Sequence, residues 1–130
     1  MNRRRVQSGA PWEESVGYSR ALRVGNTIYV AGTTATENGE PVAPGDAYRQ
    51  AQHVFATCLR AIGDLGGSAA DVVRTRMYVT DIDAHADGVG RAHAEAVGAA
   101  RPVATMVEVT RLIDPALVVE VELEAVVGSE

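Results

Sequence analysis

The sequence predicts an α+β fold, a two-layer sandwich in which one mixed β-sheet carries two helices on a single face. Three observations lead to this prediction. The chain opens with a β-hairpin pattern, its middle alternates two helical segments with a strand, and it closes on two β-rich runs. Strand–helix–strand units in a chain of 130 residues, without a repeat or a linker, predict a single domain over 1–130 in the order ββαβαββ.

The opening hairpin is predicted from alternation and from turn residues. Residues 18–24 alternate, Gly25-Asn26 supplies a two-residue turn, and residues 27–31 form the return strand. Before the hairpin we expect a short edge strand over residues 3–7 and a loop over residues 8–16. After it, residues 32–45 are rich in Gly, Pro, Thr and Asn, which predicts a loop with a bend at Asn38-Gly39.

The first helix is predicted to begin after Asp46, a good N-cap residue, and to end at Gly66-Gly67. Its apolar residues recur at spacings of three and four and form one stripe that must be buried: Ala47, Ala51, Val54, Phe55, Cys58, Leu59, Ile62 and Leu65. The stripe indicates a helix that packs on the sheet.

A strand and a second helix follow. Residues 72–80 predict a strand with Val73, Thr75, Met77 and Val79 on one face and Arg74, Arg76 and Tyr78 on the other. Either Asp81 or Asp83 begins the second helix, which runs to about Gly98. Gly88 and Gly90 lower its helix propensity.

The closing strand alternates strictly and places three carboxylates on one face. Val119, Val121, Leu123 and Ala125 point one way, and Glu120, Glu122 and Glu124 point the other. Two helices cover only one face of the sheet, so these glutamates share the helix-free face with Arg74, Arg76 and Tyr78. We expect this face to meet the same face of other copies, with opposite charges paired. The alternative is a solvated face with surface ion pairs worth about 0–1 kcal/mol each.

Composition narrows the class of protein. The chain is 46% hydrophobic and has a formal net charge of −5, which argues against binding to the backbone of a nucleic acid. Cys58 is the only cysteine and the three histidines show no metal-ligand spacing, so we expect no metal and no disulfide. No cofactor motif, signal peptide or membrane span is visible, and we expect a cytoplasmic protein.

Several runs together resemble the RidA (YjgF/YER057c/UK114) family. They are GYS at 17–19, VGNTIYVAG at 24–32, DVVRTRMYVTD at 71–81, and the closing strands at 102–109 and 119–125. The resemblance covers nearly the whole chain in order. It implies a chorismate-mutase-like fold, a homotrimer whose sheets form a central barrel, and clefts between subunits. The best-known activity of the family is hydrolysis of enamines and imines to a keto acid and ammonia.

The chain departs from the family where active members hold their substrate. Their arginine, two residues after the proline of a Pro-Ala-Arg-Ser segment, grips the substrate carboxylate, and a bidentate guanidinium suits that task. Ala104 stands there in this chain, and Met106 stands where the family has a cysteine. By contrast, Tyr18 matches the cleft tyrosine, and Glu120 matches the glutamate expected to position the attacking water.

The resemblance and the strand pattern together give two catalytic candidates, Tyr18 and Glu120, and eight substrate-binding candidates: Gly32, Thr33, Arg76, Tyr78, Arg101, Ala104, Thr105 and Met106. Arg101, expected in extended geometry before a proline, could replace the lost guanidinium or be a surface residue. Arg76 could replace it or pair with the glutamates. Glu120 could orient water or pair with an arginine.

Two functions from different classes follow. The first is a divergent RidA-family hydrolase of an enamine or imine, with altered specificity and weak or no activity on 2-iminopropanoate. The second is a non-catalytic trimer that binds a small molecule in its clefts. A third, the endoribonuclease role attached to parts of the family, fits poorly with the acidic charge.

Overall fold

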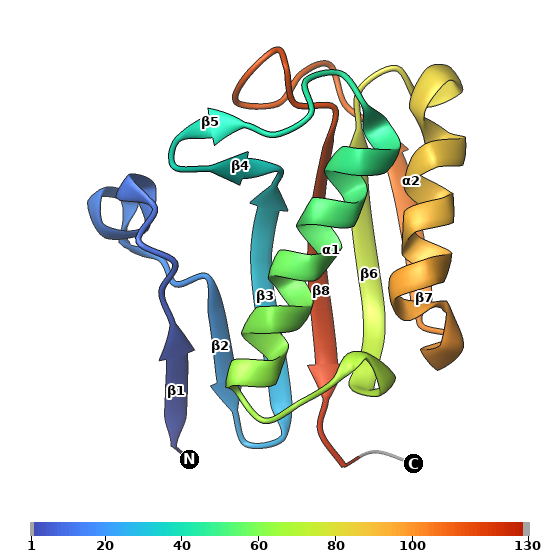
Figure 1. Ribbon diagram of the computed structural model, residues 1–130. Coiled ribbons are helices and arrows are strands. Elements are labelled where there is room, and N and C mark those ends of the chain that lie inside the picture. Colours follow the sequence, from blue (N-terminus) through green and yellow to red (C-terminus); the bar gives the residue numbers. More distant parts are fainter. Residues whose placement is uncertain (1, 129–130) are drawn as a thin grey trace.

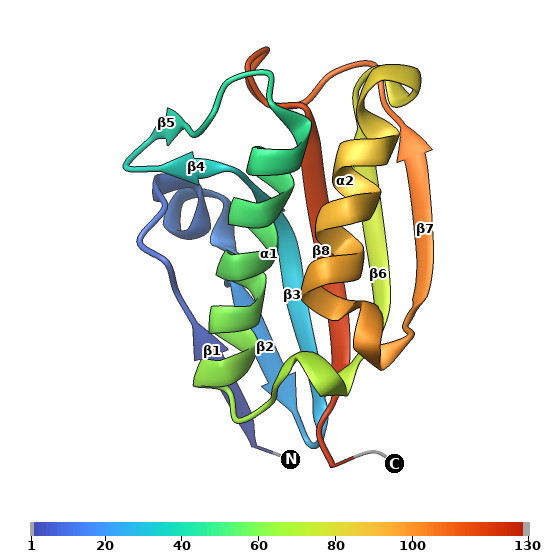
Figure 2. The same ribbon diagram turned by 45° about the vertical axis from the view of Figure 1, so that its right-hand side comes forward.

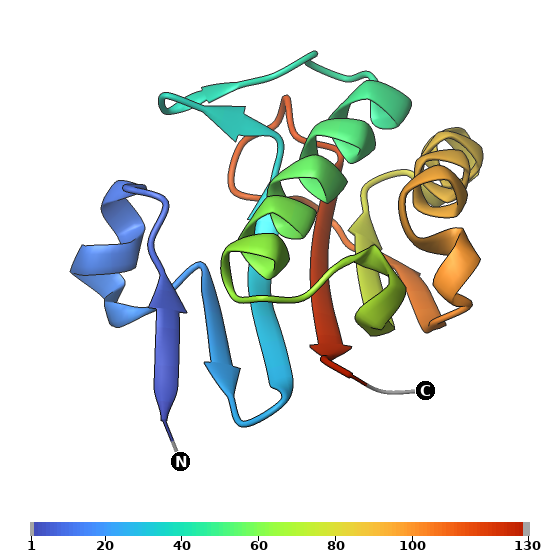
Figure 3. The same ribbon diagram turned by 60° about the horizontal axis from the view of Figure 1, so that its bottom comes forward.

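Two layers make up the protein, which the computed structural model describes over residues 2–128. One layer is a six-stranded mixed sheet, and the other consists of two helices that lie on the same face of it (Figure 1). In the turned views both long helices, which lie within residues 2–128, remain on the same side of the sheet (Figures 2 and 3). The predicted fold class is therefore confirmed.

The main sheet has the strand order β1-β2-β3-β8-β6-β7, with β6 and β7 parallel and the other neighbours antiparallel. Its strands are β1 (Arg3–Val6), β2 (Ala21–Val24), β3 (Thr27–Thr34), β6 (Val72–Val79), β7 (Val103–Glu108) and β8 (Val119–Val126). The helices are α1 (Ala47–Asp64) and α2 (Ile82–Val97), with short helical turns η1 (Glu13–Gly17), η2 (Ala69–Asp71) and η3 (Gly98–Ala100).

Helix α1 forms for the reasons that the sequence indicates. The Asp46 side chain accepts a hydrogen bond of 3.0 Å from the Arg49 backbone N–H, which caps the helix. Phe55 and Ile62 are fully buried against the sheet. Gln50 is also fully buried, and its side chain bonds the backbone of residues 43, 116 and 118. This amide fastens the loop before β8 to the helix.

Helix α2 begins after Asp81, whose side chain accepts from the Ala84 backbone. Gly88 has a packing role, because a Cβ there would lie 3.1 Å from the Tyr48 backbone nitrogen of α1. The glycine thus permits the close approach of the two helices. Its cost in helix propensity is offset by contact that a larger residue would prevent.

The strand edges differ from the sequence prediction in three places. A bulge in β6 puts Val72 in the core and leaves Val73 37% exposed, so Val73 does not share the face of Thr75 as predicted. Residues 8–16, predicted as a loop, include the start of η1. Residues 32–45 hold a small hairpin, β4 (Thr36–Glu37) and β5 (Glu40–Pro41), which turns at Asn38-Gly39 as expected.

The core lies between the sheet and the two helices. The inward residues of β8 are buried as predicted, whereas its three glutamates are only partly buried on the other face. No helix in residues 2–128 has both the length and the apolar character needed to cross a membrane.

Candidate functional site

Four of the predicted site residues come together where β3 ends and β8 begins. Thr34 pairs with Glu120 across these strands, and Gly32 lies so close to the Glu120 carboxylate that a Cβ at position 32 would overlap its Oε2. Tyr18 and Thr33 lie near Gly32 and share a hydrogen-bond donor, the Arg20 side chain. Gly32 thus leaves room for the Glu120 carboxylate in its present position, which a side chain at position 32 would displace.

Strand β3 contains a bulge next to Gly32. The register runs from Val30 opposite Leu123 to Thr33 opposite Val121, so β3 uses one residue more than β8 over this stretch. The extra residue lets Thr33 turn into the core, where it is 4% exposed, while Gly32 meets Glu120 on the helix-free face. At the bulge, the Gly32 carbonyl oxygen and the Thr33 hydroxyl are both available as acceptors for the Arg20 side chain.

That side chain is Arg20, which sequence analysis missed. It is 8% exposed, and its Nη1 donates to the Gly32 carbonyl oxygen at 2.7 Å and to Thr33 Oγ1 at 2.9 Å. Its Nη2 donates to the Tyr18 hydroxyl over a longer 3.4 Å. A guanidinium therefore lies beside Tyr18, but it belongs to Arg20 and not to Arg76 or Arg101, the two arginines that the sequence analysis proposed. The sequence did contain one signal: Arg20 follows Tyr18 by two residues in an alternating run, a spacing that places both side chains on the same face.

Arg20 is paired with a buried carboxylate. Glu13 of η1 is 3% exposed, and its Oε2 accepts from Arg20 Nε at 3.3 Å. Glu13 Oε1 also accepts from the Ser8 backbone at 2.8 Å, and Oε2 accepts from the Ser8 hydroxyl. Burial raises the pKa of Glu13, but these hydrogen bonds and the Arg20 charge outweigh burial and hold the pKa below its usual value. The pair fixes η1 against the end of β2.

Glu120 has the opposite electrostatic balance. Burial raises the pKa of its carboxyl, Arg20 lowers it, and the neighbouring Glu122 raises it, with a net rise above the usual value. No side-chain hydrogen bond within residues 2–128 reaches Glu120. A desolvated carboxylate with free lone pairs is a group that can accept a proton or hold a water.

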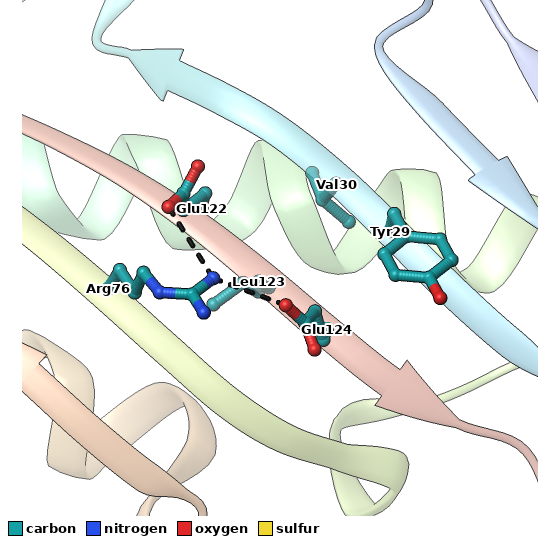
Figure 4. Close-up of a pocket in the computed structure, with 6 residues that line it drawn as sticks. All are labelled: Tyr29, Val30, Arg76, Glu122, Leu123 and Glu124. Carbon is teal, nitrogen blue, oxygen red and sulfur yellow. Dashed lines mark hydrogen bonds and ion pairs between the residues drawn. The ribbon is translucent and has the colours of Figure 1, made fainter.

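The predicted residues Arg76 and Tyr78 lie on the helix-free face and engage its glutamates. Arg76 Nη1 is 3.1 Å from Glu124 Oε1 and 3.6 Å from Glu122 Oε1, and the Tyr78 hydroxyl donates to Glu122 Oε1 at 2.7 Å. Figure 4 shows Arg76 between the two carboxylates in a hollow that Tyr29 borders on the β3 side. Arg76 could replace the lost guanidinium or pair with the glutamates, and in the structure it pairs with Glu122 and Glu124.

Three further predicted residues lie on β7, at the far edge of the sheet. Ala104 is the register partner of Thr75, Thr105 of Arg76, and Met106 of Met77. Strands β3, β8 and β6 separate them from Tyr18. One chain therefore brings Tyr18, Gly32, Thr33 and Glu120 together and leaves the β7 residues apart.

Arg101 precedes β7 and differs from expectation. It adopts a left-handed conformation with φ 52° and ψ 50°, not the extended geometry predicted before a proline, because it caps η3 and its N–H donates to the Gly98 carbonyl. Its exposed side chain makes no hydrogen bond or ion pair within residues 2–128.

Two further features of residues 2–128 bear on the chemistry of the site, the arrangement of possible metal ligands and the state of Cys58. Residues 2–128 contain no cluster of three His, Cys, Asp or Glu that could hold a metal. Cys58 is fully buried, and burial raises the pKa of its thiol to about 11 despite opposing effects of Thr33 and Arg20. Such a thiol is a core residue and not a nucleophile.

Comparison with known proteins decides the family. Residues 10–127 match the family described as Endoribonuclease L-PSP. The chain is also similar to Rv2704 of Mycobacterium tuberculosis, a member of the YjgF/YER057c/UK114 family, with 46% identity, coverage of 97% of this chain and 100% of that one, and a TM-score of 0.87. The chain belongs to the YjgF/YER057c/UK114 (RidA) family.

The chain is also similar to three further proteins. The uncharacterized protein SCO2049 of Streptomyces coelicolor is 43% identical over 97% of this chain and 93% of its own length. The RutC family protein PYRAB12510 of Pyrococcus abyssi is 33% identical, with 87% of both chains covered. RidA from the Antarctic bacterium Psychrobacter sp. PAMC 21119 superposes with a TM-score of 0.78 at 26% identity, covering 95% of this chain and 94% of that one.

Proposed function

We propose that the protein is a RidA-family hydrolase of imines or enamines that works in clefts between three identical subunits, with Glu120 as its base. The observation that carries the proposal is the Glu120 carboxylate, held over Gly32 with a raised pKa and no side-chain partner within residues 2–128. The family assignment supports the reaction class, and the site chemistry supports the roles.

The reaction needs a base and a proton donor. Glu120 takes a proton from water as the water oxygen bonds to the imine carbon, and the imine nitrogen gains a proton. The resulting carbinolamine then loses ammonia, which leaves a carbonyl, so an imine and water give a ketone and ammonia. Tyr18 is suited to donate a hydrogen bond, because its oxygen accepts from Arg20 and its own proton has no acceptor within residues 2–128.

Assembly is supported by where the candidate residues lie. Tyr18 precedes β2, and three strands lie between it and β7, the edge strand that carries Ala104 and Met106. Ala104 and Met106 also lie on the helix side of the sheet, whereas Glu120 lies on the helix-free face. A second copy of the chain would bring its own β7 residues to Tyr18 and Glu120. The helix-free face also exposes apolar residues: Tyr29 is 47% exposed, Val103 58% and Val107 41%. Burial of such groups between copies would stabilise an oligomer.

Substrate choice follows from the state of the arginines. Arg76 is already paired with two carboxylates, and Arg20 uses four of its N–H groups on Glu13, Gly32, Thr33 and Tyr18. Ala104 binds no anion. Small imino acids such as 2-iminopropanoate should therefore be poor substrates, and a larger or uncharged imine should be preferred.

The test measures turnover with a matched pair of variants. The purified protein is given 2-iminopropanoate and a panel of larger and uncharged imines, and ammonia release is followed. We expect Glu120→Gln to lower turnover of the best imine by about 100-fold or more. Glu124→Gln removes the same charge from the same strand face and should change turnover by less than about threefold. Equal loss in both variants would refute the role of Glu120.

Two further outcomes separate the alternatives. Fast hydrolysis of 2-iminopropanoate that Arg101→Ala abolishes would make Arg101 the missing grip, since its side chain is exposed and makes no hydrogen bond or ion pair within residues 2–128. No hydrolysis of any imine, together with a raised melting temperature on ligand addition, would favour a non-catalytic binding trimer. Sedimentation tests assembly, and a stable monomer would remove the shared cleft.

A further inference from the structure

A second polar group lies on the helix side of the sheet, near β7. His93 of α2 is partly buried, its ring meets Phe55 edge-to-face with centroids 5.6 Å apart, and its Nε2 is 2.8 Å from Thr75 Oγ1. Thr75 is fully buried and its hydroxyl has no other partner within residues 2–128. A buried hydroxyl is costly unless its proton is bonded, so Thr75 donates to Nε2.

This hydrogen bond fixes the tautomer of His93. With Nε2 accepting, the proton of the neutral ring lies on Nδ1. Burial lowers the pKa of His93, which favours the neutral ring at neutral pH. Nδ1 has no hydrogen-bond partner within residues 2–128 and is not among the buried unsatisfied atoms there, so it reaches solvent. His93 therefore presents one uncharged N–H donor.

Thr75, which holds the His93 ring, lies opposite Ala104 in the sheet. Thr75 and Ala104 are register partners in the parallel β6–β7 pair, so their side chains lie on the same face, toward the helices. Because β7 is an edge strand, Ala104 is exposed there, and its methyl group offers a ligand no polar contact. Met106 lies two residues further on the same face and adds a flexible apolar surface.

We propose that His93, Ala104 and Met106 form the subsite that selects the substrate, and that it takes an uncharged acceptor group, such as an amide, ester or ketone oxygen, in place of a carboxylate. This proposal rests on the proposed function, since it assumes that the cleft at β7 holds the substrate. Thr75 is its positioning residue, because it orients the ring.

The test compares two ligands of the same shape and different charge, pyruvate and pyruvamide, by calorimetric titration of the intact protein. Pyruvamide should bind about tenfold more tightly than pyruvate. His93→Phe keeps an aromatic ring against Phe55 but removes the donor, and should weaken pyruvamide by about fivefold to tenfold and leave pyruvate unchanged. His93→Gln, which retains an N–H donor, should recover part of the loss. Ala104→Arg should reverse the preference.

Several results would overturn the proposal. Tighter binding of pyruvate by the unaltered protein, no measurable binding of pyruvamide, or unchanged pyruvamide affinity in His93→Phe each contradict it. A ¹⁵N spectrum that places the ring proton on Nε2 would contradict the donor assignment.

Failure of the proposed function looks different from failure of this subsite. If His93 variants change amide binding while no imine is hydrolysed, the subsite stands and the hydrolase assignment fails. If hydrolysis depends on Glu120 but His93→Phe changes neither binding nor substrate preference, the hydrolase assignment stands and the subsite fails.

Discussion

Glu13→Gln should destabilise the protein strongly, because it leaves Arg20 buried without its countercharge. The carboxylate accepts from the Ser8 N–H at 2.8 Å, the Ser8 hydroxyl and Arg20 Nε at 3.3 Å, and both charged residues are almost fully buried. Breaking a buried ion pair from one side costs about 3–5 kcal/mol. Arg20 keeps neutral acceptors in Gly32 and Thr33, so we expect the free energy of unfolding to fall by about 3 kcal/mol, the lower end of this range.

Urea unfolding at a fixed protein concentration measures this loss. With a slope of about 1–3 kcal/mol per molar urea, a loss of about 3 kcal/mol lowers the midpoint by about 1–3 M. Glu14→Gln is the matched control, since the next residue is exposed and carries the same charge. Its effect should stay within about 0.5 kcal/mol. If the two midpoints coincide, the ion pair does not hold η1 and the reasoning is wrong.

The same pair gives a pH dependence with a definite sign. The folded-state pKa of Glu13 lies below its unfolded value near 4.5, so its stabilising contribution is complete above that pH. It is lost as the pH falls through the folded-state pKa. The difference in unfolding free energy between the unaltered protein and Glu13→Gln should therefore shrink in acid, and a difference that grows in acid would contradict the assignment.

Three further predictions concern the core and the proposed site. Cys58 should not react with a thiol reagent in the native protein and should react fully in urea, because its pKa of about 11 and its burial keep it a thiol. Gly32→Ala should displace the Glu120 carboxylate and lower imine hydrolysis by about 10–100-fold, whereas Gly63→Ala, which meets no atom within 4 Å, should leave it unchanged. Hydrolysis should rise with pH through an apparent pKa above 4.5, since burial raises the pKa of Glu120 and its ionised form is the base; a profile that falls instead would exclude that role.

Alternation along the chain predicted most of the fold because most strands keep a regular period. The burial of Val119, Val121 and Leu123 follows directly from that period, as does the position of the glutamates on the opposite face. The hairpin turn and the Asp46 cap were also predictable, since each depends on a few adjacent residues. The close approach of Glu120 to Gly32 was not predicted.

The errors occur where the period is interrupted. A bulge in β6 exchanges the roles of Val72 and Val73, and no turn residue marks it. The second bulge, between Val30 and Thr33, makes room for Arg20, whose importance depends on contacts with residues 7 and 12–13 positions away. A sequence pattern of period two carries no information about such a space, so the guanidinium beside Tyr18 emerged only from the structure.

The pairing of charges on the helix-free face bears on the proposed assembly. Bringing free charges into contact between subunits carries a desolvation cost, which attraction across the interface must offset. In this chain Arg76 already contacts two glutamates and Tyr78 one of them, so these groups are paired before any second copy arrives. The cost of burying them is thereby reduced, and the favourable contribution falls to the exposed apolar residues, Tyr29 on β3 and Val103 and Val107 on β7. Substitutions at those apolar positions should weaken a trimer more than the loss of any single ion pair.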